Sequence, residues 1–238
     1  GPYQKINVKK ENFIRDVDRL IEEGYYGLNV TVPLKEDAYK YCDNTSSVAR
    51  ALKAVNTLTV NKDGVYGDNT DPVGFEKSIA NRGLNNKPCL VLGAGGSARA
   101  VVYALTRMKC EIGIYNRTRE NAESLCSDLG VEAKILTETT LREFVGSSQL
   151  VVNTTSLGQQ EGEENNLIDF DSLNSSAHLY DLIYNPSKTT FLRHAEKNGC
   201  TVQNGLEMLI HQAAQSFNLW HDTMPEIDED LMSVLGVN

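Results

Sequence analysis

Residues 88–98, with the sequence PCLVLGAGGSA, restrict the fold of this 238-residue chain more than any other segment. The apolar run CLVL predicts a buried strand, and residues 97–107 predict a helix that follows at once. Between them lies a match to G-x-G-x-x-[GA], formed by Gly93, Ala94, Gly95, Gly96, Ser97 and Ala98. Such a strand–turn–helix unit lets a dinucleotide pyrophosphate approach the backbone at the helix N-terminus. The segment therefore predicts a dinucleotide site.

The chain that follows this unit alternates between apolar runs and helical patterns. Further strands are predicted at EIGIYN (111–116), QLVVNTT (149–155), HLYDLIY (178–184) and CTVQ (200–203), with a helix over 120–129. The run GLEMLIHQAAQSFNLW (205–220) predicts a long closing helix. Strands that alternate with helices in this way indicate a doubly wound parallel sheet.

The first third of the chain has a different pattern. We predict a helix over 9–23, a strand over 28–32, short helices from Glu36 and Ser46, and a helix over 75–82. The apolar run AVNTLTV (54–60) is followed by Asp63-Gly64, which marks a hairpin turn. The polar stretch GLNNKP (83–88) predicts a linker. We therefore expect a separate α/β domain before the doubly wound sheet.

The end of the second strand of the predicted sheet indicates which dinucleotide binds. An NAD site typically has an acidic residue about 20 positions beyond the glycines. Here Asn116 stands at that point, and Arg117, Thr118 and Arg119 follow it. A carboxylate would repel a 2′-phosphate, whereas the guanidinium fork of arginine suits one. The sequence therefore predicts NADP rather than NAD.

Two charged residues are candidates for acid–base chemistry. We expect Lys35 to end one strand and Asp71, in GDNTD, to end another. A reductase that acts on a carbonyl must protonate the oxygen that hydride transfer leaves negative. A lysine beside an aspartate supplies that proton and stabilises the charge. Spacing alone leaves a second interpretation open, in which the two residues are unrelated surface charges.

Composition excludes several classes of function. The net charge of −9 and the pI near 5.0 argue against a nucleic-acid surface. The five cysteines are scattered without a C-x-x-C pair, so we expect neither a disulfide framework nor a metal site. No apolar run approaches the ~20 residues of a membrane span, and no signal peptide is recognisable. These features indicate a cytoplasmic enzyme without a membrane partner.

The motifs taken together resemble the shikimate dehydrogenase family. They are, in chain order, NVTVPLK, AVNT, GDNTDPVGF, GAGGSARA, NRT and GLEMLIHQAA, and they extend from about residue 25 to 215. The resemblance implies NADP-dependent interconversion of 3-dehydroshikimate and shikimate in aromatic amino-acid biosynthesis. It also implies that Lys35 and Asp71 are the catalytic pair.

The resemblance extends to the binding residues. It implies that the substrate is held by Thr31, Asn56, Asp71, Tyr184 and Gln212. It implies that the cofactor contacts Leu182 and Gly205 in addition to the glycine-rich turn and residues 116–118. From the residues alone, Thr31 could instead be a helix N-cap, Asn56 part of a turn, and Gln212 part of a polar helix face.

The chain departs from the family pattern at three places. The family begins with a strand and a Ser-x-Ser-Pro segment that binds the substrate carboxylate, and about 30 such residues are missing before Lys35. We therefore expect weakened substrate affinity and a bare sheet edge. Pro72 replaces the usual glycine, which the first turn of a helix tolerates. Asn121 replaces the usual second arginine of the cofactor motif, with Arg119 close by as a substitute.

The sequence therefore predicts an α/β fold of two domains with the active cleft between them. The substrate domain comprises 1–84, completed by helices in 206–238, and lacks its N-terminal strand. The NADP-binding, Rossmann-like domain comprises 85–205. Two alternatives remain open: a dehydrogenase that uses both quinate and shikimate, and a noncatalytic NADP-binding regulator. We expect small-molecule partners and a monomer or homodimer.

Overall fold

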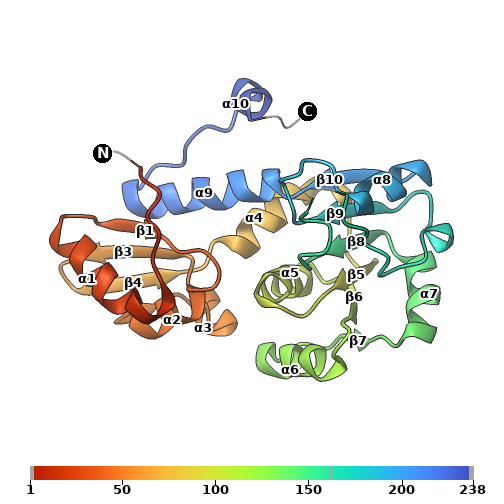
Figure 1. Ribbon diagram of the computed structural model, residues 1–238, viewed down its shortest axis with the longest axis horizontal. Coiled ribbons are helices and arrows are strands. Elements are labelled where there is room, and N and C mark those ends of the chain that lie inside the picture. Colours follow the sequence, from red (N-terminus) through yellow and green to blue (C-terminus); the bar gives the residue numbers. More distant parts are fainter. Residues whose placement is uncertain (1–2, 161, 236–238) are drawn as a thin grey trace. The chain divides into compact units, whose positions relative to one another are not determined.

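A computed structural model describes residues 3–160 and 162–235 (Figure 1). The chain forms two compact units. Unit 1 comprises residues 1–70 and 215–225, and unit 2 comprises residues 71–214 and 226–238. These limits differ from the sequence-derived boundaries at 84/85 and 205/206, which stay a prediction about where substrate and cofactor domains divide.

Unit 2 is built on a six-stranded sheet in which every neighbouring pair is parallel. In spatial order the strands are β10 (Thr201–Asn204), β9 (His178–Asp181), β8 (Leu150–Asn153), β5 (Pro88–Leu92), β6 (Glu111–Tyr115) and β7 (Lys134–Ile135). The chain starts at the centre with β5, runs outward through β6 and β7, and returns to β8 on the other side. This order is that of a doubly wound sheet, so the predicted fold class is confirmed.

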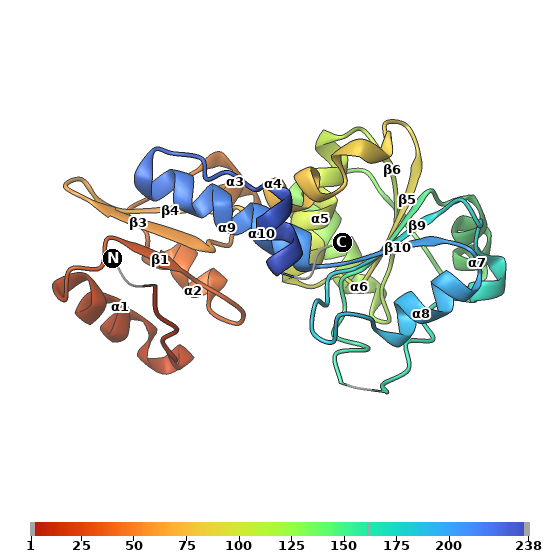
Figure 2. The same ribbon diagram turned by 90° about the horizontal axis from the view of Figure 1, so that it is seen from above.

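Helices cover both faces of this sheet, as Figure 2 shows for α5 and α6 on one side and α7 and α8 on the other. The first face is covered by α4 (Asp71–Ser78), α5 (Gly96–Arg107) and α6 (Arg119–Leu129). The second is covered by α7 (Glu138–Ser147) and α8 (Thr190–Lys197). The central strands β5 and β8 are therefore buried on both sides, which explains why their sequences are almost entirely apolar.

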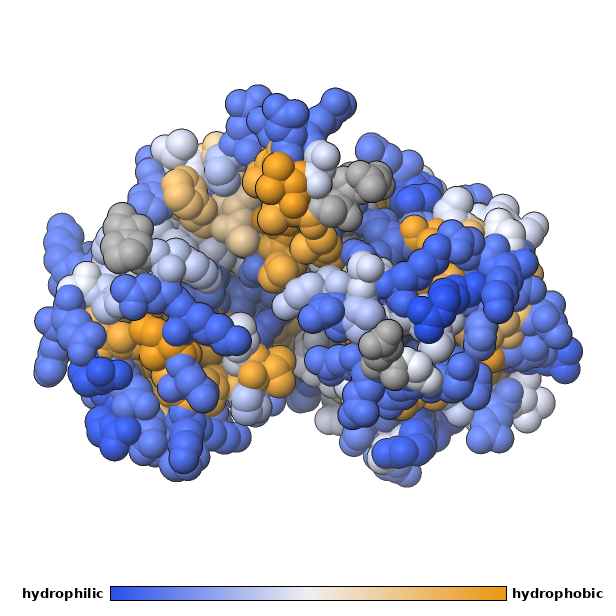
Figure 3. Space-filling view, turned by 45° about the horizontal axis from the view of Figure 1, so that its top comes forward, coloured by the Kyte–Doolittle hydropathy of each residue, from blue (hydrophilic) through white to orange (hydrophobic). Residues whose placement is uncertain are grey.

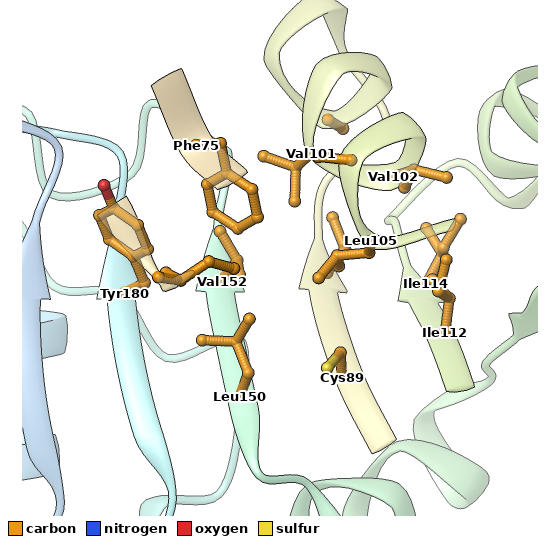
Figure 4. Packing of buried hydrophobic residues seen from close by; sticks show 14 of the residues in the cluster. Phe75, Cys89, Val101, Val102, Leu105, Ile112, Ile114, Leu150, Val152 and Tyr180 are labelled. Atoms are coloured by element: carbon orange, nitrogen blue, oxygen red, sulfur yellow. The ribbon is translucent and has the colours of Figure 1, made fainter. Parts of the chain in front are cut away.

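Side chains alternate between the two cores along each strand of unit 2. On β5, Cys89 and Val91 face the α5 side, whereas Leu90 and Leu92 face the α7 side. Figure 4 shows the first of these cores, in which side chains from three neighbouring strands meet Val101 and Leu105 of α5. Phe75 of α4 stacks on Tyr180 of β9 with ring centroids 5.4 Å apart. The packing thus fixes α4 and α5 on the sheet that carries the glycine-rich turn.

Unit 1 contains a four-stranded mixed sheet in the order β1 (Gly27–Asn29), β3 (Thr57–Asn61), β4 (Gly64–Asp68) and β2 (Asn44–Thr45). Strands β3 and β4 form the hairpin predicted at Asp63-Gly64. The core on one face joins the sheet to α1 (Phe13–Glu22), α2 (Lys35–Tyr41) and α3 (Ser47–Leu52). The second half of α9 (Leu206–His221) also belongs to this unit, where Trp220 donates to the Leu58 carbonyl oxygen at 3.0 Å.

Two predictions about strand ends were wrong. Strand β1 ends at Asn29 rather than at residue 32, because residues 31–34 form a turn in which the Leu34 N–H donates to the Thr31 carbonyl oxygen. Pro33, which follows a cis peptide bond, has no N–H to continue a ladder. Strand β4 ends at Asp68, and Asp71 begins α4. Lys35 and Asp71 are therefore first residues of helices and do not end strands.

Other helix limits also differ from the predictions. Helix α4 begins four residues earlier than predicted, and it ends at Ser78 before a 3₁₀ turn, η2 (Ala80–Arg82). Gly83, with φ +61°, closes this turn in the left-handed region, as the predicted end at that glycine requires. A 3₁₀ turn, η1 (Lys10–Asn12), precedes α1. The sequence interpretation did not specify β2, β7, α7, α8, η3 (Phe170–Ser172) or α10 (Glu229–Val234).

In Figure 3, hydrophilic residues cover most of the visible face, with smaller hydrophobic areas between them. Among the described residues, no helix is both long enough and apolar enough to span a membrane.

Candidate active site

The glycine-rich turn connects β5 to α5 in unit 2. Gly93 has φ +108°, and a Cβ atom there would lie 2.6 Å from Thr154 Oγ1. Only glycine combines this backbone conformation with so close a neighbour. Gly93 is therefore required by the turn itself, as the sequence predicted for a dinucleotide-binding unit.

The next two glycines have a different environment. A Cβ atom at Gly95 or Gly96 would meet no described atom within 4 Å. Because the protein leaves this space open at the N-terminus of α5, the backbone N–H groups there are accessible to an anion. Ala98 is fully buried in the core beneath α5, the close packing predicted for this position. The turn thus fits a pyrophosphate.

An open pocket of about 310 Å³ lies beside this turn. Its lining includes Gly93, Asn116, Arg117, Thr118 and Thr155, and none of its lining residues is acidic. The Asn116 side-chain amide donates to the Thr118 carbonyl oxygen at 2.7 Å, which shapes the loop after β6. A pocket with an arginine and no carboxylate favours a 2′-phosphate over free ribose hydroxyls.

Arg119 lies in a different environment from Arg117. Its Nε is 2.7 Å from Glu123 Oε1 within α6, and it does not line the pocket. Asn121, which stands where the family has a second arginine, does line the pocket. The structure thus gives no contact that makes Arg119 a substitute.

The nicotinamide-side candidates Leu182 and Gly205 directly follow β9 and β10, respectively. The Leu182 N–H donates to the Asn153 carbonyl oxygen at 3.0 Å, and the Gly205 N–H donates to the Ile183 carbonyl oxygen at 3.3 Å. A Cβ atom at Gly205 would collide with the Leu182 carbonyl group, so the close approach of these two backbones requires glycine. Leu182 and Gly205 are therefore brought together. Tyr184, two residues after Leu182, is 49% exposed.

Asp181, at the end of β9, was not predicted as a site residue. It is fully buried, and burial raises its pKa to about 6 in spite of hydrogen bonds from Thr189, Ile183 and Asn153. In the sequence, Asp181 is only one of several polar residues that end neighbouring parallel strands, and no local pattern marks it as buried.

In unit 1, Lys35 begins α2 and is half-buried. The positive end of a helix dipole is an unfavourable position for a cation, so packing or function must place a lysine there. Thr31 is exposed in the turn that precedes this helix. The N-cap of α2 is Leu34, so the alternative in which Thr31 caps the helix is wrong.

Asn56 is buried at the start of β3 and anchors the residue before Asp71. Its Oδ1 accepts the Thr70 N–H at 2.9 Å, and its Nδ2 donates to Thr70 Oγ1 at 3.0 Å. The Thr57 hydroxyl donates to Asn56 Oδ1 at 2.8 Å and lies 2.7 Å from the Ser216 hydroxyl. Asn56 thus belongs to a network that fixes Thr70, and with it the entry into α4.

Asp71 and Gln212 lie on two helices that pack closely within unit 2. A Cβ atom at Gly74 would lie 2.7 Å from the Met208 carbonyl oxygen and 2.8 Å from Gln212 Cβ. The absence of a side chain at Gly74 therefore lets the first turns of α4 approach α9 at Gln212. The Gln212 amide also donates to the Leu209 carbonyl oxygen at 3.1 Å.

Sequence reasoning missed the hydroxyl groups of the Asn56 network. Thr57 and Thr70 stood within the quoted motifs AVNT and GDNTD but were given no role. Ser216 is buried and lies 3.1 Å from Asn29 Nδ2, a contact that joins α9 to β1. No local signal marks Ser216, since its partners lie more than 140 residues away in sequence.

Three models of protein families match most of the chain. The family model described as "Shikimate dehydrogenase substrate binding domain" matches residues 1–58, and "Shikimate / quinate 5-dehydrogenase" matches residues 76–182. A third, "Shikimate 5'-dehydrogenase C-terminal domain", matches residues 205–235. The matched segments therefore include Lys35, the glycine-rich turn and all of α9.

Individual relatives are shikimate dehydrogenases as well. A shikimate dehydrogenase (NADP(+)) from Caldicellulosiruptor bescii is 38% identical over 220 residues, which cover 90% of this chain and 76% of the relative. The crystal structure of shikimate dehydrogenase from Aquifex aeolicus superimposes with a TM-score of 0.87 at 29% identity, covering 96% of this chain and 83% of that one. The Thermus thermophilus enzyme, solved in complex with NADP(H) and shikimate, gives a TM-score of 0.84 at 33% identity, covering 96% and 84%. The chain belongs to the shikimate dehydrogenase family.

Proposed function

We propose that the protein is an NADP-dependent oxidoreductase that interconverts 3-dehydroshikimate and shikimate in aromatic amino-acid biosynthesis. The observation that carries this proposal is the pocket beside the glycine-rich turn, which presents Arg117 and no acidic residue. It occurs in a chain whose first 58 residues match a shikimate-binding domain. The partners are then two small molecules, and a cytoplasmic location fits a biosynthetic enzyme of this kind.

The residues of unit 2 fit NADP. We assign the pyrophosphate to the open space at Gly95 and Gly96 and the 2′-phosphate to Arg117, because Arg117 lines the adjacent pocket. Leu182 and Gly205 supply close backbone on the nicotinamide side. When bound, NADP supplies the hydride acceptor, and NADPH the hydride donor.

Lys35 and Asp71 are the proposed acid–base pair. In the direction of reduction, the carbonyl oxygen of the substrate gains negative charge and takes a proton from the Lys35 ammonium group. In the direction of oxidation, the neutral amine takes that proton back from the hydroxyl group. Asp71 is proposed to hold the Lys35 ammonium group in place beside the reacting oxygen.

The proposed substrate contacts suit a ring that bears several hydroxyl groups. Thr31, Tyr184 and Gln212 offer both donors and acceptors, which a polyhydroxylated ring needs for a fixed orientation. Asn56 is proposed to contribute as well. Its amide also holds Thr70, so its loss affects both the binding of hydroxyl groups and the entry into α4.

Quinate is a second candidate substrate, because the family model that matches residues 76–182 is named for both compounds. A steady-state assay with shikimate or quinate, each paired with NADP⁺ or NAD⁺, tests the proposal. We expect the highest kcat/KM for shikimate with NADP⁺, and at least about a tenfold preference for NADP⁺, or about 1.4 kcal/mol.

The other outcomes of this assay are informative. Comparable kcat/KM for quinate would establish dual specificity, which one extra hydroxyl group makes difficult to prevent. Binding of NADP⁺ without turnover of either substrate would indicate a noncatalytic regulator and overturn the proposed activity. A preference for NAD⁺ would overturn the assignment of Arg117.

A further inference from the structure

The carboxylate of Asp181 lies at the carboxyl end of β9 and is completely buried. Oδ1 accepts the Asn153 side-chain amide at 3.0 Å and the Ile183 N–H at 3.1 Å, and Oδ2 accepts the Thr189 hydroxyl at 2.6 Å. No lysine, arginine or histidine within residues 3–160 and 162–235 forms an ion pair with it. Asp181 is thus a buried charge that is held by hydrogen bonds alone.

Two of these hydrogen bonds join the opposite ends of one loop. Ile183 is at the beginning of the segment between β9 and α8, and Thr189 is the N-cap of α8 at its end. One carboxylate therefore holds both ends of residues 182–189. Leu182 and Tyr184, the proposed contacts to the cofactor and the substrate, both lie in this loop.

The third hydrogen bond extends the arrangement to the neighbouring loop. Asn153 ends β8, and its Oδ1 accepts the Thr155 N–H at 3.1 Å and the Thr155 hydroxyl at 2.7 Å. Thr155 lines the pocket beside the glycine-rich turn, and its methyl group would lie 3.0 Å from a Cβ atom at Gly93. The loops after β8 and β9 are thus hydrogen-bonded to each other through Asn153 and Asp181, and Thr155 of the first loop lies close to Gly93.

These loops lie at the carboxyl ends of the strands, where a doubly wound sheet binds its ligands. Strands β5, β8 and β9 are adjacent, and the chain reverses its direction of winding between β5 and β8. Ligands of doubly wound sheets bind outside the carboxyl ends of the strands at such a reversal. A buried carboxylate without a cation destabilises a fold unless other groups compensate. Asp181 therefore occupies a costly position at the edge of the sheet where a dinucleotide binds.

We propose that Asp181 is a positioning residue for NADP binding. Its hydrogen bonds fix the loops after β8 and β9 in the conformation that binds the nucleotide. The inference rests on the proposed use of NADP and extends it to a residue that does not line the nucleotide pocket. If the loops are not held beforehand, binding must order them, and affinity falls by that cost. The loss is therefore expected in the dissociation constant of NADP⁺ rather than in kcat at saturating cofactor.

Thr189 allows the hydrogen bond to Asp181 to be tested apart from helix capping. Thr189→Val removes both the bond to Asp181 and the capping bond to the Leu192 N–H, whereas Thr189→Ser keeps both. Thr137→Val is the matched control, because Thr137 caps α7 through the Thr140 N–H at 3.3 Å, close to the 3.4 Å of Thr189. The control loses a cap of the same kind without touching Asp181.

The dissociation constant of NADP⁺ is measured by titration of protein fluorescence, without substrate. We expect Thr189→Val and Asp181→Asn to raise it about tenfold, as the loss of one charge-assisted hydrogen bond predicts, and Thr189→Ser and Thr137→Val to leave it within twofold. At saturating NADP⁺, kcat for shikimate should stay within about threefold of the unaltered value for all four variants.

Three results would overturn the inference. They are an unchanged dissociation constant for Thr189→Val, an equal rise for Thr137→Val, and failure of the unaltered protein to bind NADP⁺. Absence of shikimate turnover with normal NADP⁺ binding would instead overturn only the proposed activity. If Asp181→Asn does not fold, the Thr189 series alone decides the question.

Discussion

The two units hold their candidate site residues with networks of different chemistry. In unit 1, the neutral side chains of Asn56, Thr57, Thr70 and Ser216 hydrogen-bond to one another. In unit 2, the corresponding anchor is the buried carboxylate of Asp181. The anchors differ in charge: a neutral network holds Thr70 in unit 1, whereas a carboxylate holds the loop of unit 2 that carries proposed cofactor and substrate contacts. Changes of pH should therefore act on the anchor in unit 2 and not on the network in unit 1.

The largest effect is expected from Lys35→Ala. It removes the proton donor and the charge that stabilises the oxyanion, so kcat should fall about 10²–10⁴-fold. The dissociation constant of NADP⁺ should not change, because the proposed nucleotide contacts lie in unit 2. Lys40→Ala, an exposed position on the same helix, is the control. Preserved kcat with a raised KM would make Lys35 a binding residue only.

Asp71→Asn tests whether Asp71 and Lys35 act together. The aspartate and the lysine are proposed to act as one unit, so the single substitution should lower kcat, and Lys35→Ala with Asp71→Asn should be little worse than Lys35→Ala alone. Steady-state kinetics of the two single variants and the double variant measure this. Multiplication of the two losses would show that the residues act separately.

Asn56→Ala tests the neutral network. It leaves the Thr70 N–H and the Thr57 hydroxyl without their buried acceptor, so the free energy of unfolding should fall by about 2–3 kcal/mol. Denaturant titration at pH 5 and pH 7 should give the same loss, because the network members do not titrate. Asn61→Ala, at the exposed hairpin, is the control and should cost less than about 1 kcal/mol. A loss of that small size for Asn56→Ala would show that the network is not essential.

Acidification should act on two buried groups of unit 2 with opposite signs. Burial raises the pKa of Asp181 from 3.8 to about 6, so the folded state binds a proton more readily than the unfolded state, and this residue makes the protein less stable as pH rises through that interval. Burial, together with the charge of Arg82, lowers the pKa of His178 from 6.5 to about 4, so this residue makes the protein more stable as pH rises.

The two contributions are measured by substitution. From pH 7 to pH 5, Asp181 should add about 1 kcal/mol to stability and His178 should remove about 2 kcal/mol, so the two contributions partly offset each other. Asp181→Asn should therefore make the loss of stability on acidification steeper by about 1 kcal/mol over this interval. Chemical denaturation at both pH values gives the difference directly. An identical pH dependence of the two proteins would show that Asp181 does not titrate with a raised pKa.

The last of these predictions concerns Arg117. Arg117→Ala should weaken NADP⁺ about tenfold and leave NAD⁺ nearly unaffected, because only NADP carries the 2′-phosphate. Arg119→Ala should change neither, since its guanidinium group pairs with Glu123. Titration of each nucleotide into each variant tests the pair. Equal losses for both nucleotides would remove Arg117 from recognition of the 2′-phosphate.

Sequence alone predicted unit 2 better than unit 1 for a physical reason. Strands buried on both faces, such as β5 and β8, read as unbroken apolar runs, and glycines that a turn requires are visible as a motif. The strands of unit 1 are half-buried, and polar turns lie between them and the helices that follow. The limits of β1 and β4 were therefore misplaced, and Lys35 and Asp71 were assigned to strand ends rather than helix starts.

The anchors were not predictable in either unit. Asn56 and Ser216 are 160 positions apart in sequence, and both contact Thr70, which no local pattern reveals. Asp181 reads as an ordinary polar end of a strand until its burial is known. Periodicity predicts which face of an element is apolar. It does not predict which polar side chains of distant segments satisfy one another, since that depends on how the elements pack.

The central claim is the transfer of hydride from shikimate to NADP⁺, and isotope labelling tests it most directly. Shikimate is labelled with deuterium on the ring carbon whose hydroxyl group becomes the carbonyl, and it is incubated with the protein and NADP⁺. We predict that the nicotinamide ring of the NADPH formed carries one deuterium per molecule of 3-dehydroshikimate, by mass spectrometry of both products. Deuterium that is released to water, or no labelled nucleotide although both ligands bind, would contradict the account.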